Sequence, residues 1–168
     1  TYFWGLPAVV RDFLKELKLQ STGAHYVYFV ATYGLISGQI DSMAHDIMKE
    51  KGYPLDARFN VKMPDTWTPV FDLTDDEKVS AINRKADSRI SEILRVIKEK
   101  GKGGFMKNKA PMLAVRAVYP SYEWMRKTSR LTVEDTCSGC GLCAKKCPVC
   151  AIEMKNGRPV WVKDKCSL

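Results

Sequence analysis

Four cysteines near one end of this chain constrain its possible folds more than any other feature. They are separated by two, two and three residues, and a proline follows the fourth: Cys137, Cys140, Cys143, Cys147 and Pro148. Thiolates at this C-x2-C-x2-C-x3-C-P spacing ligate bacterial iron–sulfur clusters. Gaps of two residues let a tight loop wrap one corner of a cubane cluster, and Gly139 and Gly141 let the backbone turn closely around it. The run therefore predicts an iron–sulfur site.

Two other uses of these thiols compete with the cluster. Zinc is the first, because two C-x2-C pairs are present. The pairs are Cys137 with Cys140 and Cys147 with Cys150. Zinc sites usually place such pairs about 15–20 residues apart, and only six residues separate them here. A redox dithiol at the second pair is the other use, but a long helix should then follow. Residues 151–162 instead alternate around an Asn-Gly dipeptide, as a hairpin does.

Composition limits the compartment and the partners of the protein. We find neither a secretory signal nor an apolar stretch of the roughly 20 residues that a membrane helix needs. We therefore expect a cytoplasmic protein without membrane contact, where clustered thiols stay reduced. The net charge of +8 permits binding to nucleic acid or to an acidic protein, but it demands neither. Its densest part, residues 98–109, is rich in lysine and glycine and predicts a mobile, solvated loop. A docking site for a negatively charged partner is the alternative.

The first part of the chain alternates between helical and strand patterns. Apolar residues recur with helical spacing in 7–17, 40–48 and 74–97, and the last of these helices is preceded by a Thr-Asp-Asp-Glu capping box. Residues 26–34 form a continuous apolar run, which predicts a strand buried on both faces, and 57–63 alternate as a shorter strand. This order predicts an α/β fold with a parallel sheet and flanking helices.

Two strands are too few for a stable parallel sheet covered by three helices. We therefore expect further sheet-forming sequence before Thr1 in the native protein. A small helical domain with two incidental apolar runs is the alternative. Residues 101–130 have no readable pattern and are interpreted as a connector. The predicted organisation is a partial α/β domain over 1–100, a connector over 101–130 and a small α+β metal module over 131–168.

The module resembles the first half of a bacterial two-cluster ferredoxin, because "CGLCAKKCP" is followed by a hairpin over residues 132–168. In that family the fourth cysteine of one run ligates the other cluster. The resemblance implies that the first [4Fe-4S] cluster is bound by Cys137, Cys140 and Cys143, and the second by Cys147 and Cys166. The run that should begin at Cys166 is not completed. We therefore expect either a longer native chain or recruitment of Cys147 or Cys150 as a substitute ligand, with Cys150 otherwise a spare buried thiol.

The first domain resembles a flavodoxin, and the order of the two domains resembles a family of flavodoxin–ferredoxin fusion proteins of anaerobes. "YFWGLP" resembles the first flavin loop of that family and "ATYG" the second. The resemblance implies an FMN held between these loops at the carboxyl ends of the strands. The implied flavin-contacting residues are Tyr2, Trp4 and Gly5 in the first loop and Thr32, Tyr33 and Gly34 in the second. Packing of Tyr2, Phe3 and Trp4 as ordinary core aromatics at a strand end is the alternative.

Taken together, the motifs predict electron transfer through [4Fe-4S] clusters to or from FMN, with redox proteins as partners and no nucleic acid. A flavin-dependent oxidoreductase fed by the ferredoxin module is the second hypothesis, and a structural zinc module the third. The sequence favours an electron carrier over a substrate-specific enzyme. No nucleophile elbow, phosphate-cradling Gly-Lys-Ser/Thr run or paired carboxylates are present that would indicate other catalysis.

Overall fold

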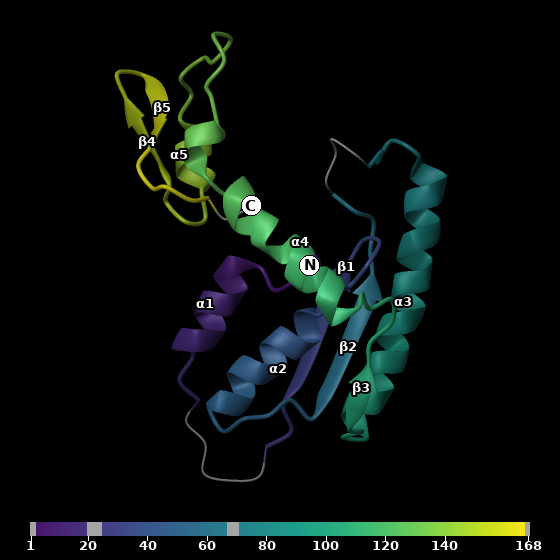
Figure 1. Ribbon diagram of the computed structural model, residues 1–168. Helices are drawn as coiled ribbons and strands as arrows, with labels where there is room; N and C mark the ends of the chain where they lie inside the picture. The colour runs from purple at the N-terminus through teal and green to yellow at the C-terminus, as the bar shows by residue number, and fades with distance from the viewer. Residues whose placement is uncertain (1–2, 20–24, 67–70, 167–168) are drawn as a thin grey trace. The chain divides into compact units, whose positions relative to one another are not determined.

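A computed structural model describes residues 3–19, 25–66 and 71–166 of the chain. The chain divides into two compact units, Thr1–Tyr119 and Pro120–Leu168. The boundary falls inside helix α4 (Met112–Met125), which contains Pro120. Figure 1 gives the order of the elements along the chain. Each unit is described by itself below.

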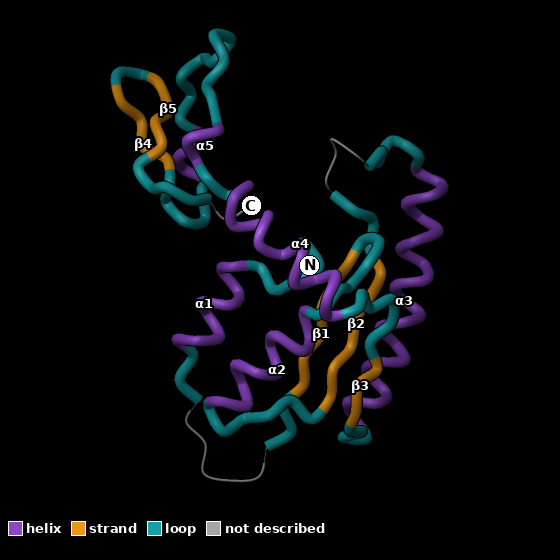
Figure 2. The backbone as a smooth tube through the Cα atoms, in the orientation of Figure 1, coloured by secondary structure: helices purple, strands orange, loops and turns teal. Residues whose placement is uncertain are grey.

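The first unit is an α/β arrangement around a three-stranded parallel sheet, which confirms the predicted class (Figure 2). The strands lie in the order β1-β2-β3. Its elements before α4 are α1 (Ala8–Glu16), β1 (Tyr28–Tyr33), α2 (Ile40–Glu50), β2 (Ala57–Lys62), α3 (Asp76–Lys98) and β3 (Gly103–Phe105). Helices α1 and α2 lie on one side of the sheet and α3 on the other (Figure 1).

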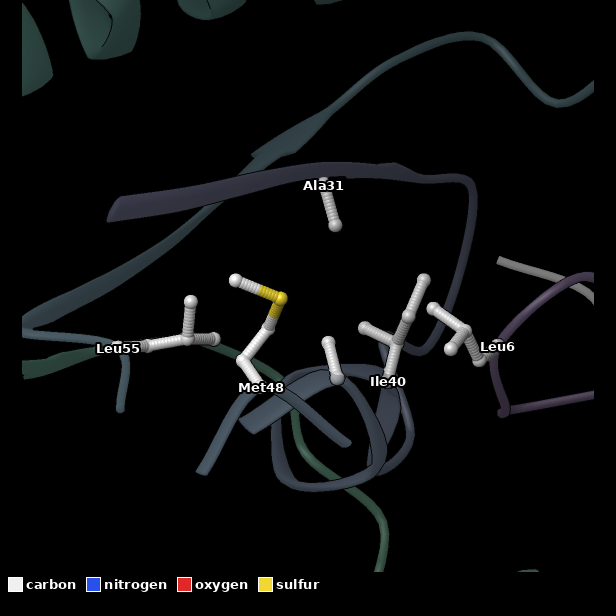
Figure 3. Packing of buried hydrophobic residues seen from close by; sticks show 6 residues of the cluster. Leu6, Ala31, Ile40, Met48 and Leu55 are labelled. Carbon is white, nitrogen blue, oxygen red and sulfur yellow. The ribbon is translucent and has the colours of Figure 1, made fainter. Parts of the chain in front are cut away.

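Each face of the sheet carries its own apolar core. One core joins α1 and α2 to β1, and Figure 3 shows its side chains converging between helix and strand. Its buried members are Leu6, Ala31, Ile40, Ala44, Met48 and Leu55. The other core joins α3 to β2, and its buried members are Ala57, Phe59, Val61, Ala86 and Ile93. The alternation of side chains along a strand explains why one sheet supports two cores.

Strand β1 departs from the prediction that it is buried on both faces. It lies at the edge of the sheet, and Tyr28 and Val30 are 48% and 43% exposed. These side chains point to the face that α3 covers over β2, as the register of Val30 opposite Phe59 indicates. The prediction of a strand in this apolar run is confirmed, but the prediction that both of its faces are buried is wrong.

The lysine- and glycine-rich stretch is not the solvated loop that its composition predicts. Gly103–Phe105 forms β3, which pairs in parallel with Ala57–Phe59 of β2. The segment after β3 is held by the Asn60 side chain of β2 through two hydrogen bonds to the Lys107 backbone. Asn60 Nδ2 donates to the Lys107 carbonyl oxygen at 2.6 Å, and Asn60 Oδ1 accepts from the Lys107 N–H at 2.9 Å. The segment expected to be a connector thus supplies a strand of the sheet.

Helix α3 begins one residue later than the predicted capping box. The Asp75 carboxylate caps it by accepting a hydrogen bond from the Lys78 N–H at 3.0 Å, and the Thr74 hydroxyl is bonded instead to Asp72. Asp76 and Glu77 in the first turn complement the positive end of the helix dipole. None of the helices in the described part of the chain combines the length and apolar content of a bilayer-spanning segment.

The second unit is small and has little apolar core. Its elements after α4 are the short 3-10 helix η1 (Thr128–Arg130), α5 (Leu142–Lys146), β4 (Ile152–Lys155) and β5 (Arg158–Trp161). The two strands form the predicted antiparallel hairpin around Asn156-Gly157. Both turn residues have positive φ, 51° and 76°, as a two-residue hairpin turn requires. Among its described hydrophobic side chains, only those of Tyr122 and Ala151 belong to the buried core.

Candidate metal centre

The four cysteines of the run lie on a loop, a short helix and the turn that follows. Cys137 and Cys140 precede α5, Cys143 lies within it, and Cys147 is its C-cap residue. Cys150 follows in a turn closed by its N–H to the Cys147 carbonyl oxygen at 3.1 Å. Cys137, Cys140, Cys143 and Cys150 are exposed, whereas Cys147 is half-buried. The run therefore presents its thiols at the surface of the second unit.

Two glycines of this loop adopt a backbone conformation that other residues avoid. Gly139 and Gly141 have φ of 70° and 73°, in the left-handed region. A Cβ atom on Gly139 would also collide with the backbone carbonyl oxygen of Gly157 in the hairpin turn. Only glycine therefore allows the cysteine loop and the hairpin to approach so closely.

Backbone amides are directed at two of the thiols. The Ala151 N–H donates to Cys147 Sγ at 3.2 Å, and this hydrogen bond holds the pKa of the Cys147 thiol below its ordinary value. Two hydrogen bonds lower the pKa of the Cys140 thiol in the same way. The larger effect comes from the Leu142 N–H and the smaller from the Ser138 side chain. Donors to sulfur stabilise the thiolate, which is the form that binds metals. The loop thus favours the charge state that a cluster ligand needs.

Cys166 lies at the end of the second unit and is held by its backbone. Its N–H donates to the carbonyl oxygen of Arg126 at 2.9 Å, and Arg126 Nε donates back to the Cys166 carbonyl oxygen at 2.8 Å. Thr128 secures the segment just before it, because its hydroxyl donates to the Lys163 carbonyl oxygen at 2.6 Å. The last cysteine therefore occupies a defined position.

The thiols are not gathered around one point. Within residues 3–19, 25–66 and 71–166, no three His, Cys, Asp or Glu side chains lie close enough together to hold a metal ion. What the loop offers a cluster is its donor set: thiols at the right spacing, amides aimed at sulfur, and glycines that keep the backbone close. These features fit a cluster, and the side chains would have to turn toward it.

The size of the second unit bears on the same question. Chains shorter than roughly 70 residues seldom obtain enough stability from an apolar core alone, and disulfides or bound metals commonly supply the rest. The unit Pro120–Leu168 is shorter than this, and its described cysteines form no disulfide. Because its apolar core is small, a metal cluster is a suitable source of the missing stability.

The second expected flavin loop lies at the carboxyl end of β1 and the first lies beside the start of α2, but the glycine of each loop packs against a protein side chain. Tyr2 lies outside the described residues. A Cβ atom on Gly5 would collide with the ring of Tyr119, and one on Gly34 with the carboxylate of Asp65. These glycines therefore approach protein side chains, and Gly5 is buried whereas Gly34 is half-buried. A flavin at this position stays a prediction based on Trp4 and the second loop.

The remaining residues of the two flavin loops are held by the protein. The Trp4 carbonyl oxygen accepts from the Gln39 N–H at 2.8 Å, so the loop is tied to the start of α2. Tyr33 is buried and its hydroxyl accepts from Asn108 Nδ2 at 2.9 Å, while Thr32 is exposed. Thr32 and Trp4 thus retain some exposed surface, and Tyr33 contributes to a pocket described below.

Sequence reasoning missed the charged and polar residues that tie residues 107–110 to α2 and to the loop before it. The buried Asp41 carboxylate lies 2.9 Å from Lys109 Nζ and 3.8 Å from Arg58. Ser37, also buried, donates from Oγ to the Lys107 carbonyl oxygen at 2.8 Å. These partners are far apart in the chain, so no local pattern could reveal them.

Comparison of the chain with protein-family models, curated proteins and solved structures found no match.

Proposed function

We propose that this protein carries electrons through [4Fe-4S] clusters. The observation that carries the proposal is the cysteine run on a glycine-constrained loop in a unit with almost no apolar core. Such a cluster, when bound, accepts and releases one electron at a potential that its surroundings tune. Redox proteins would supply and accept these electrons.

The proposal assigns a role to the cysteines, the glycine and the backbone amides of the run. Cys137, Cys140 and Cys143 are the ligands of the first cluster. Gly139 keeps the loop against the hairpin, and the amides that donate to sulfur lower the charge density on the thiolates. Hydrogen bonds to sulfur of this kind raise or lower the potential of a centre and orient its ligands.

Cys147 and Cys166 are proposed as ligands of a second cluster. Two features support this role: the amide donor on Cys147 and the fixed backbone of Cys166. FMN at the carboxyl end of the parallel sheet is the proposed exchange partner for these electrons. This flavin part of the proposal is separable, because it depends on Trp4 and Thr32 and not on the cysteines.

An electron-transfer experiment tests the proposal. The full chain is loaded with iron and sulfide under anoxia, reduced with dithionite, and mixed with a one-electron acceptor such as ferricyanide. We expect the visible charge-transfer absorbance to bleach on reduction and to return in proportion to the acceptor added. Cys143→Ser should lose this reversible signal, because Cys143 is a cluster ligand in the account.

Cys150→Ser is the matched comparison, since it also removes an exposed thiol from the same loop but none of the five ligands assigned above. It should retain the reversible signal. Loss of the signal in this variant would identify Cys150 as the substitute ligand. A protein that takes up zinc in place of iron, or whose colour does not respond to reductant, would contradict the proposal. Retention of the full signal in Cys143→Ser would contradict the ligand assignment.

A further inference from the structure

A basic pocket lies beyond the carboxyl ends of the strands in the first unit and is independent of the cysteines. Its volume is about 260 Å³. The last residues of β1 and β2 line it together with one wall of α3 and the segment after β3. The polar residues of its lining are Tyr33, Asn60, Lys62, Lys85, Arg89 and Lys107. In open α/β sheets, ligands bind at this end of the strands.

The pocket has a strong excess of positive charge. Its lining, which lies entirely within the described residues, contains four cationic side chains and no carboxylate. Glu92 is the acidic neighbour of this group and pairs with Arg89 at 2.7 Å. Lys62, Lys85 and Lys107 have no ion pair in the part of the chain that the structure describes. Glu92 also interacts electrostatically with Lys107, so one carboxylate faces four cations. Grouped cations with too little negative charge beside them repel one another and favour a bound anion.

The framework of the pocket is fixed before any ligand enters. Arg89 donates from Nη2 to the Phe105 carbonyl oxygen at 2.6 Å and from Nε to the Asn60 carbonyl oxygen at 3.3 Å. Its guanidinium therefore joins α3 to the ends of β2 and β3. The Asn60 side chain in turn holds the backbone of Lys107. These bonds fix Arg89 and the backbone of Lys107, so only the exposed lysine side chains lose conformational freedom on binding.

The donors that remain suit a compact oxyanion. The three lysines supply point charges on flexible stems, which is how lysine commonly contacts phosphate. The Tyr33 hydroxyl accepts from Asn108 at 2.9 Å, so its own O–H remains to donate. A volume of about 260 Å³ is below the usual range of drug-sized sites. It matches a phosphate group better than a whole nucleotide.

We propose that this pocket binds the phosphate group of a small phosphorylated molecule. The inference does not depend on the iron–sulfur proposal, because every lining residue belongs to the first unit. Lys62, Lys85 and Lys107 are the anion-binding residues, and Arg89 is a positioning residue. The remainder of the ligand extends from the open side of the pocket.

Calorimetric titration of the full chain with inorganic phosphate, and separately with ribose 5-phosphate, tests the proposal. We expect saturable binding to one site. A charge-assisted hydrogen bond typically changes a binding constant by about tenfold or more. Lys62→Gln with Lys107→Gln should therefore weaken phosphate binding by about a hundredfold. Tighter binding of ribose 5-phosphate would identify a phosphomonoester, and equal binding would identify the free anion as sufficient.

The matched control is Lys15→Gln with Lys49→Gln, which removes the same charge from exposed positions on α1 and α2. This control should bind phosphate as the parent does. Circular dichroism of each variant verifies that the fold is retained. Absence of saturable binding by either probe, or equal weakening in both double variants, would overturn the proposal.

Discussion

Gly139→Ala is the substitution that most sharply probes the contact between the cysteine loop and the hairpin. The new Cβ would meet the Gly157 carbonyl oxygen at an impossible separation, and the backbone φ of 70° is unfavourable for alanine. Gly157→Ala is its matched control. Gly157 has a similar φ of 76°, but a Cβ there meets no atom within 4 Å.

Both substitutions place a side chain on a left-handed backbone, but only Gly139→Ala also creates a steric collision. A non-glycine residue in the left-handed region costs about 1–2 kcal/mol, which applies to both positions. Forcing an extra carbon into an occupied site costs a further 1–3 kcal/mol, roughly, and this applies to Gly139 alone. We expect Gly157→Ala to lower the free energy of unfolding by about 1–2 kcal/mol and Gly139→Ala to lower it by about 2–5 kcal/mol.

Urea unfolding of the iron-loaded protein under anoxia measures this difference. The visible absorbance reports the cluster, and circular dichroism reports the backbone. Metal binding and folding are coupled in small modules, so both signals should be lost together and at lower urea in Gly139→Ala. Equal losses in the two variants, or a larger loss in Gly157→Ala, would refute the close approach of loop and hairpin.

Three further predictions concern single residues. Cys150→Gly should raise the free energy of unfolding by about 0.5–1 kcal/mol in urea, since Cys150 has a φ of 48° and glycine relieves that strain; a loss of stability would contradict this. Asp41→Ala should cost about 2–4 kcal/mol by the same assay, because its cationic partners lose their buried counter-charge; a neutral effect would refute that role. Hydrogen bonds from Lys102 and, second, from the Val27 N–H lower the pKa of the Asp56 carboxyl in the folded protein. The stability that ionised Asp56 contributes is therefore fully present above about pH 4 and is lost as the pH falls through the folded-state pKa. Urea midpoints of Asp56→Asn should accordingly fall less than those of the parent on acidification, and an equal fall would count against this linkage.

The parallel α/β class could be predicted because its signals are local. The helical stripes and the apolar run before Gly34 each lie within one element, and the Asn-Gly turn located the hairpin. Strand β3 could not be predicted, because two of its three residues are glycines and their pairing with β2 is tertiary. The burial of β1 was also unpredictable, since edge position depends on which strands pair beside it.

The ligands of the candidate metal centre stay a prediction from the sequence, and the geometry that supports the cysteine loop could not be predicted from it. Thiol spacing is a property of the sequence alone. The collision that forbids a side chain at Gly139 involves a carbonyl oxygen in a turn farther along the chain. The basic pocket was hidden for the same reason, because Lys62, Lys85 and Lys107 come from separate elements. Composition placed Lys107 in a solvated loop, whereas Asn60 holds its backbone at the sheet.

The content of iron and acid-labile sulfide per chain, after anaerobic loading and gel filtration, tests the central claim most directly. The account predicts iron and sulfide in equal molar amounts. The content of both should fall strongly when Cys137, Cys140 and Cys143 are replaced together by serine. Protein that stays free of iron, or that holds zinc without sulfide, would contradict it.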